Sequence, residues 1–180
     1  MLPNLPLGEA VEWLVDMIEL YLGWLLDGIS AILGFLVDGF QDLLLVAPPL
    51  VTILVFGVIV FLVTRRDWKL AVLTIAGLLL IWNLELWKLS METLALVVTA
   101  TIIALLIGLP VGILASMNDH LDSIVKPVLD FMQTMPSFVY LIPAVIFFGL
   151  GNVPGIVATV IFAMPPAIRL TNLGIRQIPK

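Results

Sequence analysis

The chain of 180 residues contains no cysteine and a single histidine, His120. Disulfides, thiolate chemistry and cysteine-ligated metals are therefore excluded, and one histidine cannot by itself supply a zinc site or a histidine-based triad. Charged residues are also scarce, at 12%, and the formal net charge is −5. Because nucleic-acid binding needs clustered Lys and Arg, we expect no nucleic-acid partner and no metal site in this chain.

Several catalytic and nucleotide-binding motifs are missing too. No lysine follows a glycine, which excludes a Walker A loop, and there is no Gly-x-Ser-x-Gly, His-Glu-x-x-His or dinucleotide fingerprint. Ionisable residues are nearly absent from the long apolar runs, which weakens the case for a proton-driven transporter. If the chain moves solutes, we expect it to be no enzyme and to hold no cofactor, with the energy entering through another chain.

What the chain has in excess is apolar residues, at 62%, with a mean hydropathy of +1.20. A soluble domain is closer to half apolar and a quarter charged, so most of this chain must face lipid. About 20 apolar residues cross a bilayer as a helix. The apolar runs predict an all-α membrane protein with about five transmembrane helices, near 47–64, 70–87, 93–115, 129–149 and 155–173. Trp82 and Trp87 fit an interfacial aromatic belt.

The distribution of Lys and Arg predicts the orientation. If the first span exits toward the cytoplasm, the other side receives only Lys88. The cytoplasmic side then receives Arg65, Arg66, Lys69, Lys126, Arg169, Arg176 and Lys180. By the positive-inside rule, we expect a multi-pass protein of a prokaryotic cell membrane, with 65–69 and 169–180 cytoplasmic and the N-terminal segment outside.

Residues 8–45 are apolar but interrupted by acidic and small residues that fall in one sector of a helical wheel. This pattern predicts one amphipathic helix, or two in series, lying in the outer interface; a sixth span over 20–37 is the alternative. The segment has no basic region that would make it a cleavable signal peptide. Because its polar face is entirely acidic, unlike that of most interfacial helices, we expect it to pack partly on protein, such as a second copy of the chain.

Prolines and glycines punctuate the predicted spans. Pro110, Pro143, Pro165 and Pro166 predict helix kinks, which would suit a bent bundle around a pathway. The Gly-xxx-Gly spacing of Gly108 and Gly112 allows another backbone to approach closely, and we interpret it as packing. The run of turn residues over 149–155 predicts a break between the last two spans.

The segment 131–140 is the predicted part of the pathway lining. It brings hydroxyls, an amide, thioethers and phenyl rings together at the start of a span. Aromatic faces attract quaternary ammonium groups, and methionines form an adaptable wall; ordinary helix packing is the plainer interpretation. The candidates are Phe131, Met132, Gln133, Thr134, Met135, Pro136, Ser137, Phe138 and Tyr140.

Three stretches carry a resemblance to a known family. They are TLALVVTAT at 93–101 leading into GLPVGILAS at 108–116, PVLDFMQTMPSFVYLIP at 127–143, and FGLGNVPG at 148–155 continuing through FAMPPAIR at 162–169 to QIP at 177–179. From about residue 92 to 179, the chain resembles the permease subunit of glycine betaine/proline betaine ABC importers. The first stretch is generic to binding-protein-dependent permeases, whereas the second and third look specific to the osmoprotectant branch.

The resemblance implies an organisation and a set of partners. It implies an extracytoplasmic helical segment at 1–45, two peripheral transmembrane helices at 46–91, and the first three helices of an incomplete permease core at 92–180. It also implies a homodimer in the bilayer, a cytoplasmic ABC ATPase that binds ATP and magnesium, and an extracytoplasmic substrate-binding protein. Such permeases continue into a loop with a Glu-Ala-Ala signature that docks on the ATPase, so the chain is expected to be cut off before it.

The function implied by the resemblance is import of glycine betaine or a related compatible solute by alternating access, as osmoprotection. The same class of permease with choline, carnitine or proline as its solute stays open. A second hypothesis, of another class, is a membrane scaffold or anchor subunit that transports nothing. Such a scaffold would co-purify with no ATPase.

Overall fold

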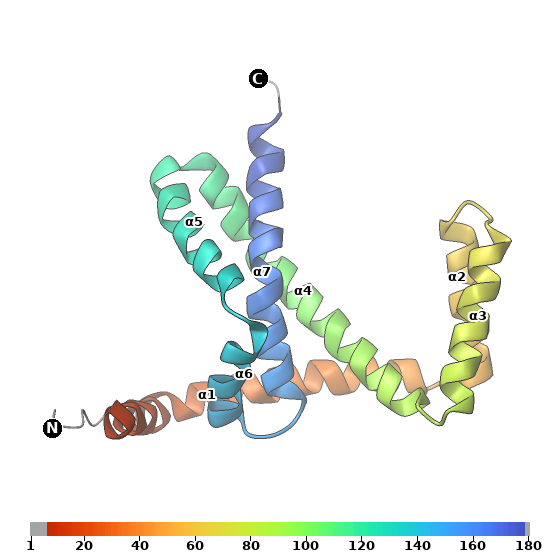
Figure 1. Ribbon diagram of the computed structural model, residues 1–180, viewed down its shortest axis with the longest axis horizontal. Coiled ribbons are helices and arrows are strands. Elements are labelled where there is room, and N and C mark those ends of the chain that lie inside the picture. The colour runs from red at the N-terminus through yellow and green to blue at the C-terminus, as the bar shows by residue number, and fades with distance from the viewer. Residues whose placement is uncertain (1–6, 179–180) are drawn as a thin grey trace, which may run out of the picture.

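The computed structural model describes residues 7–178, and these residues form helices without a strand (Figure 1). This confirms the predicted all-α membrane fold. The helices are α1 (Leu7–Leu45), α2 (Pro49–Val63), α3 (Trp68–Asn83), α4 (Trp87–Met117), α5 (Asp119–Thr134), α6 (Ser137–Phe148) and α7 (Asn152–Arg176).

The centre of the fold is the contact between α4 and α7, which run parallel. A β-carbon added at Gly108 would lie 2.9 Å from the Ala167 Cβ, and one added at Gly112 would lie 2.8 Å from the Ile168 carbonyl oxygen. The two glycines therefore let the helix backbones meet, which confirms the predicted role of the Gly-xxx-Gly spacing. Ala100 and Ala104 continue this buried stripe of small residues. We call this contact the α4–α7 seam.

The N-terminal segment is one continuous helix, α1, of 39 residues. At 1.5 Å per residue it is about 58 Å long, nearly twice the hydrocarbon thickness of a bilayer. It lies across one end of the fold and crosswise to α7 (Figure 1). Leu33 and Val37 are buried in the central core with residues of α4 and α7, whereas none of residues 8–29 is classed as buried.

The α2–α3 hairpin is short and largely exposed. Its helices have 15 and 16 residues, or about 22 and 24 Å, less than the full hydrocarbon thickness. Only its base packs on the rest of the protein, where Ile53 contacts Trp87 and Met91 of α4. Trp87 is 7% exposed, so the prediction that it belongs to an interfacial belt is wrong: its ring fills the junction between the hairpin and α4.

The predicted span at 129–149 is not one straight helix: it falls on two helices, α5 and α6, that meet at an angle of 93° and together are long and apolar enough for one broken span. The break follows from Pro136, which has no N–H and forces the preceding residue out of the helical region. Met135 is accordingly extended, with ψ 133°. Across the break, the Tyr140 hydroxyl donates a hydrogen bond to the Met132 carbonyl at 3.0 Å.

The turn between α6 and α7 lies where the sequence predicted a break. Helix α6 ends at Phe148, and α7 begins at Asn152, inside the predicted turn. Gly149 and Gly151 have φ of 73° and 145°, values that side chains with a β-carbon rarely allow. The α2–α3 turn, the α4–α5 turn and the C-terminal end of α7 then lie at one end of the fold, and α1 lies at the other (Figure 1).

Candidate functional site

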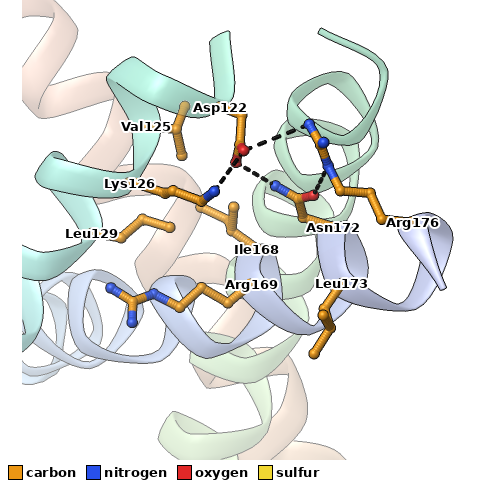
Figure 2. Close-up of a pocket in the computed structure, with 9 residues that line it drawn as sticks. All are labelled: Asp122, Val125, Lys126, Leu129, Ile168, Arg169, Asn172, Leu173 and Arg176. Atoms are coloured by element: carbon orange, nitrogen blue, oxygen red, sulfur yellow. Dashed lines mark hydrogen bonds and ion pairs between the residues drawn. The ribbon is translucent and has the colours of Figure 1, made fainter. Parts of the chain in front are cut away.

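Two cavities lie along α7, one against α5 and one against α6. The first, which we call the inner cavity, has a volume of about 270 Å³ and lies near the C-terminal end of α7. Figure 2 shows the side chains of Lys126, Asn172 and Arg176 gathered around Asp122, whereas the Arg169 side chain points away from them. Its lining consists of Asp122, Val125, Lys126, Leu129, Ile168, Arg169, Asn172, Leu173 and Arg176.

Asp122 is the centre of the polar groups in the inner cavity. Its carboxylate accepts a hydrogen bond from the Asn172 amide at 2.7 Å and pairs with the Lys126 ammonium at 2.7 Å. The Arg176 guanidinium lies 3.5 Å away (Figure 2). The residue lies between the predicted spans 93–115 and 129–149. The hydrogen bond from Lys126 is the largest influence on its carboxyl and, with that from Asn172, lowers the pKa of Asp122, while burial opposes this.

Arg176 joins the end of α7 to the α4–α5 turn. Its guanidinium donates hydrogen bonds to the Ala115 carbonyl at 3.0 Å, to the Asp119 carboxylate at 2.8 Å and to the Asn172 amide oxygen at 2.8 Å. The turn itself is fixed by Asn118, whose side chain caps α5 by accepting from two backbone N–H groups.

The charges around the inner cavity are paired with one another. Arg169 forms an ion pair with Asp130, and Lys126 and Arg176 pair with Asp122 and Asp119. Paired groups of this kind hold helices together and leave no unbalanced charge for a ligand. We therefore interpret the polar cluster as a structural clamp between α5, the α4–α5 turn and α7. The sequence analysis did not predict this clamp. The available signal was an Asp and an Asn next to apolar runs, since such residues are rarely buried without a partner.

The second cavity, which we call the α6–α7 groove, has a volume of about 310 Å³. It is open on one side and combines an apolar wall with two hydroxyls. No charged side chain lines it. The lining residues are Ser137, Phe138, Leu141, Gly155, Ala158, Thr159 and Phe162.

The structure divides the predicted pathway residues between two helices and the break that joins them. Ser137 and Phe138 lie at the start of α6 and line the α6–α7 groove. Phe131 lies on α5 and is 62% exposed. Gln133, Thr134 and Pro136 are exposed, and Met132, Met135 and Tyr140 are half-buried.

The sequence analysis did not assign the α7 half of the groove. Gly155, Ala158, Thr159 and Phe162 follow one another at spacings of three, one and three residues on one helix face, and this repeat was the available signal. One of the two hydroxyls is committed locally: the Thr159 hydroxyl donates to the Gly155 carbonyl at 2.7 Å.

The prolines predicted to kink the helices lie inside continuous helical segments. Pro110 lies in α4, Pro143 in α6, and Pro165 and Pro166 in α7. The kinks themselves stay a prediction, whereas Pro136 separates two helices. Within residues 7–178, no group of three or more His, Asp or Glu side chains is placed to hold a metal ion.

Comparison with known proteins relates nearly the whole chain to membrane permeases. Residues 104–180 match the family described as the binding-protein-dependent transport system inner membrane component. The chain is 51% identical over 98% of its length to the glycine betaine/carnitine transport permease protein of Listeria monocytogenes, and covers 63% of that protein. It is 44% identical over 99% of its length to the glycine betaine transport system permease protein of Bacillus subtilis, and covers 62% of it.

A third relative covers less of the chain. The glycine betaine/proline betaine transport system permease protein of Escherichia coli is 48% identical over 78% of the chain, which spans 39% of that protein. The chain therefore spans less than two thirds of the length of each of these relatives.

Proposed function

Residues 104–180 match the family described as the binding-protein-dependent transport system inner membrane component, and from this match we propose that the chain acts in an ATP-driven importer as a permease subunit. The solute is glycine betaine or a related quaternary ammonium compatible solute. The observation that carries the proposal is the 44–51% identity to two glycine betaine permeases over 98–99% of the chain. The membrane scaffold hypothesis has no comparable support.

The proposed partners are those that such an importer needs. A cytoplasmic ABC ATPase binds ATP with magnesium and hydrolyses it, so this chain performs no catalysis. An extracytoplasmic substrate-binding protein delivers the solute to the outer face. Two copies of the permease form the transport pathway at their interface. This pathway opens alternately to the outer and the cytoplasmic side of the membrane.

The proposed orientation places α1 at the outer face of the cell membrane and the end of α7 in the cytoplasm. The α2–α3 turn, which carries Arg65 and Arg66, and the end of α7, which carries Arg176, lie at the same end of the fold (Figure 1). The positive-inside rule assigns that end to the cytoplasm. Helix α1 lies crosswise to α7 at the opposite end, which favours an interfacial helix over a sixth span.

The experiment that tests this function is uptake of radiolabelled glycine betaine into vesicles containing the assembled transporter. Uptake should require both ATP and the binding protein, and vesicles with an ATPase variant that cannot hydrolyse ATP are the control. Uptake that persists without ATP or without binding protein would contradict the proposal. Competition by unlabelled choline, carnitine and proline then separates the solute alternatives.

A further inference from the structure

The α6–α7 groove contains two aromatic rings from two different helices, Phe138 at the start of α6 and Phe162 in α7. We propose that the groove receives the methylated ammonium head of the solute between these rings. This inference rests on the proposed function, which supplies the solute class. It assigns to the pathway residues of α7 that the sequence analysis did not name as pathway candidates.

Ring exposure supports a contact with a ligand. Phe138 is 74% exposed and Phe162 is 52% exposed, so each residue keeps at least half of its surface accessible in this chain. An aromatic face attracts a cation within about 6 Å of its centre, and the attraction strengthens when water is excluded. Phe138 and Phe162 line the same groove from two helices that pack on each other, so one trimethylammonium group in the groove can meet both rings.

The floor of the groove is made of small side chains. Gly155 and Ala158 are two of the lining residues, and the volume of about 310 Å³ lies at the lower end of the range for small-molecule sites. The Thr159 hydroxyl is already bonded to the Gly155 carbonyl. The groove therefore selects by shape and by cation–π attraction more than by hydrogen bonding.

The chemistry of the lining residues distinguishes this groove from the inner cavity. The charged side chains that line the inner cavity are paired with carboxylates, and none of the described residues that line it is aromatic. The α6–α7 groove is lined by no charged residue. A betaine carries its own carboxylate and is neutral overall, so it needs no countercharge from the wall.

These 180 residues contain no cysteine, so a thiol introduced here can be tested in an assembled transporter whose other cysteines have been replaced. Ser137→Cys places one thiol of this chain in the groove, and Leu150→Cys, at a position 92% exposed in the α6–α7 turn, is the control. Each variant is treated with two thiosulfonate reagents of similar size, one carrying trimethylammonium and the other sulfonate. The ratio of the two labelling rates should be at least about threefold higher for S137C than for L150C.

Substitutions of Phe162 and an analogue of the solute provide the matched comparisons. In the S137C background, Phe162→Leu should lower the ratio toward the L150C value, since only the Phe138 ring remains, whereas Phe162→Tyr should preserve it. Glycine betaine should slow labelling of S137C by the trimethylammonium reagent, and its uncharged-carbon analogue tert-butylacetate should not. Equal ratios at the two positions would overturn the inference, and so would a ratio that F162L leaves unchanged.

Two further outcomes separate this inference from the proposed function. A thiol in S137C that neither reagent modifies would mean that protein or lipid covers the groove, and it would overturn the inference. ATP-dependent betaine uptake alongside equal ratios would overturn the inference and leave the proposed function standing. Ring-dependent labelling without any ATP-dependent uptake would support the groove and overturn the importer.

Discussion

The α4–α7 seam and the α2–α3 hairpin are both apolar, yet only the seam is extensively buried within the protein. Helix α4 buries a stripe that includes Ala100, Ala104, Gly108 and Gly112, whereas α3 buries only Ala71. Hydrophobicity does not separate the two regions, because lipid is as good a solvent for Leu and Val as a protein interior is. The size of the side chains separates the two regions, because small residues let two helix backbones meet, and this close packing stabilises the contact.

The largest expected effect in this comparison comes from Gly112→Ala in the seam. The new β-carbon would lie 2.7 Å from the Thr171 Cβ and 2.8 Å from the Ile168 carbonyl oxygen, and the backbone atom cannot rotate away. Overpacking of this kind typically costs about 1–3 kcal/mol. We expect a lower free energy of unfolding in detergent micelles, measured by thermal or denaturant titration.

Gly77→Ala in α3 is the matched control for this substitution. No atom lies within 4 Å of a β-carbon placed at Gly77, and alanine is a better helix former than glycine by about 0.5–1 kcal/mol. The two glycine-to-alanine changes should therefore shift stability in opposite directions. Equal shifts would mean that the seam is not packed backbone to backbone.

An intermediate effect is expected from Gly57→Ala, where α2 and α3 approach each other. The added β-carbon would lie 2.6 Å from the Ile75 Cγ1 and 2.7 Å from its Cδ1. Ile75 is half-buried, so its side chain can move at about 0.5–1.5 kcal/mol, the cost of leaving a preferred rotamer. The free energy of unfolding should fall by less than in G112A. A loss as large as that of G112A would show that the hairpin is as tightly packed as the seam.

The seam was also the more predictable of the two regions. The Gly108–Gly112 spacing predicted a close backbone contact, and the glycine-rich run at 149–155 predicted the turn before α7; the structure contains both. These features could be predicted because each depends on local chemistry: the absence of a β-carbon in one case and a positive φ in the other.

The features of the fold and of the site that the sequence did not predict depend on contacts between residues that are distant in the chain. Apolar length predicted one span at 129–149, since a hydropathy pattern does not reveal a bend at Met135 and Pro136. The environment of Trp87 depends on where the hairpin packs. The α6–α7 groove likewise joins residues from two helices, so the sequence indicated Phe138 and missed Phe162.

The polar clamp closes the seam at one end, and Asn172→Ala tests whether it contributes to the difference between the two regions. The change removes the hydrogen bond to Asp122 and the one accepted from the Arg176 Nε atom. We expect a destabilisation smaller than that of G112A, because Lys126 and Arg176 still face the Asp122 carboxylate. Asn83→Ala, at the exposed last residue of α3, is the control and should change the free energy of unfolding little.

The smallest expected effect is the dependence of this clamp on pH. The folded protein lowers the pKa of Asp122 from its ordinary value of 3.8, mainly through the hydrogen bond from Lys126 and against the opposing effect of burial. The folded state therefore favours the ionised carboxylate, and the stabilisation is fully present above pH 3.8 and is lost as the pH falls through the lowered pKa.

The difference in unfolding free energy between the wild type and N172A should consequently stay constant from neutral pH down to about pH 5. It should narrow only in more acidic solution, where Asp122 is protonated in both proteins. A difference that already narrows near neutral pH would mean that the Asn172 contribution depends on a group other than Asp122. Gly112→Ala should show no such narrowing, because the steric contact between its β-carbon and the α7 backbone does not titrate, and this contrast separates the two ways in which α7 is held.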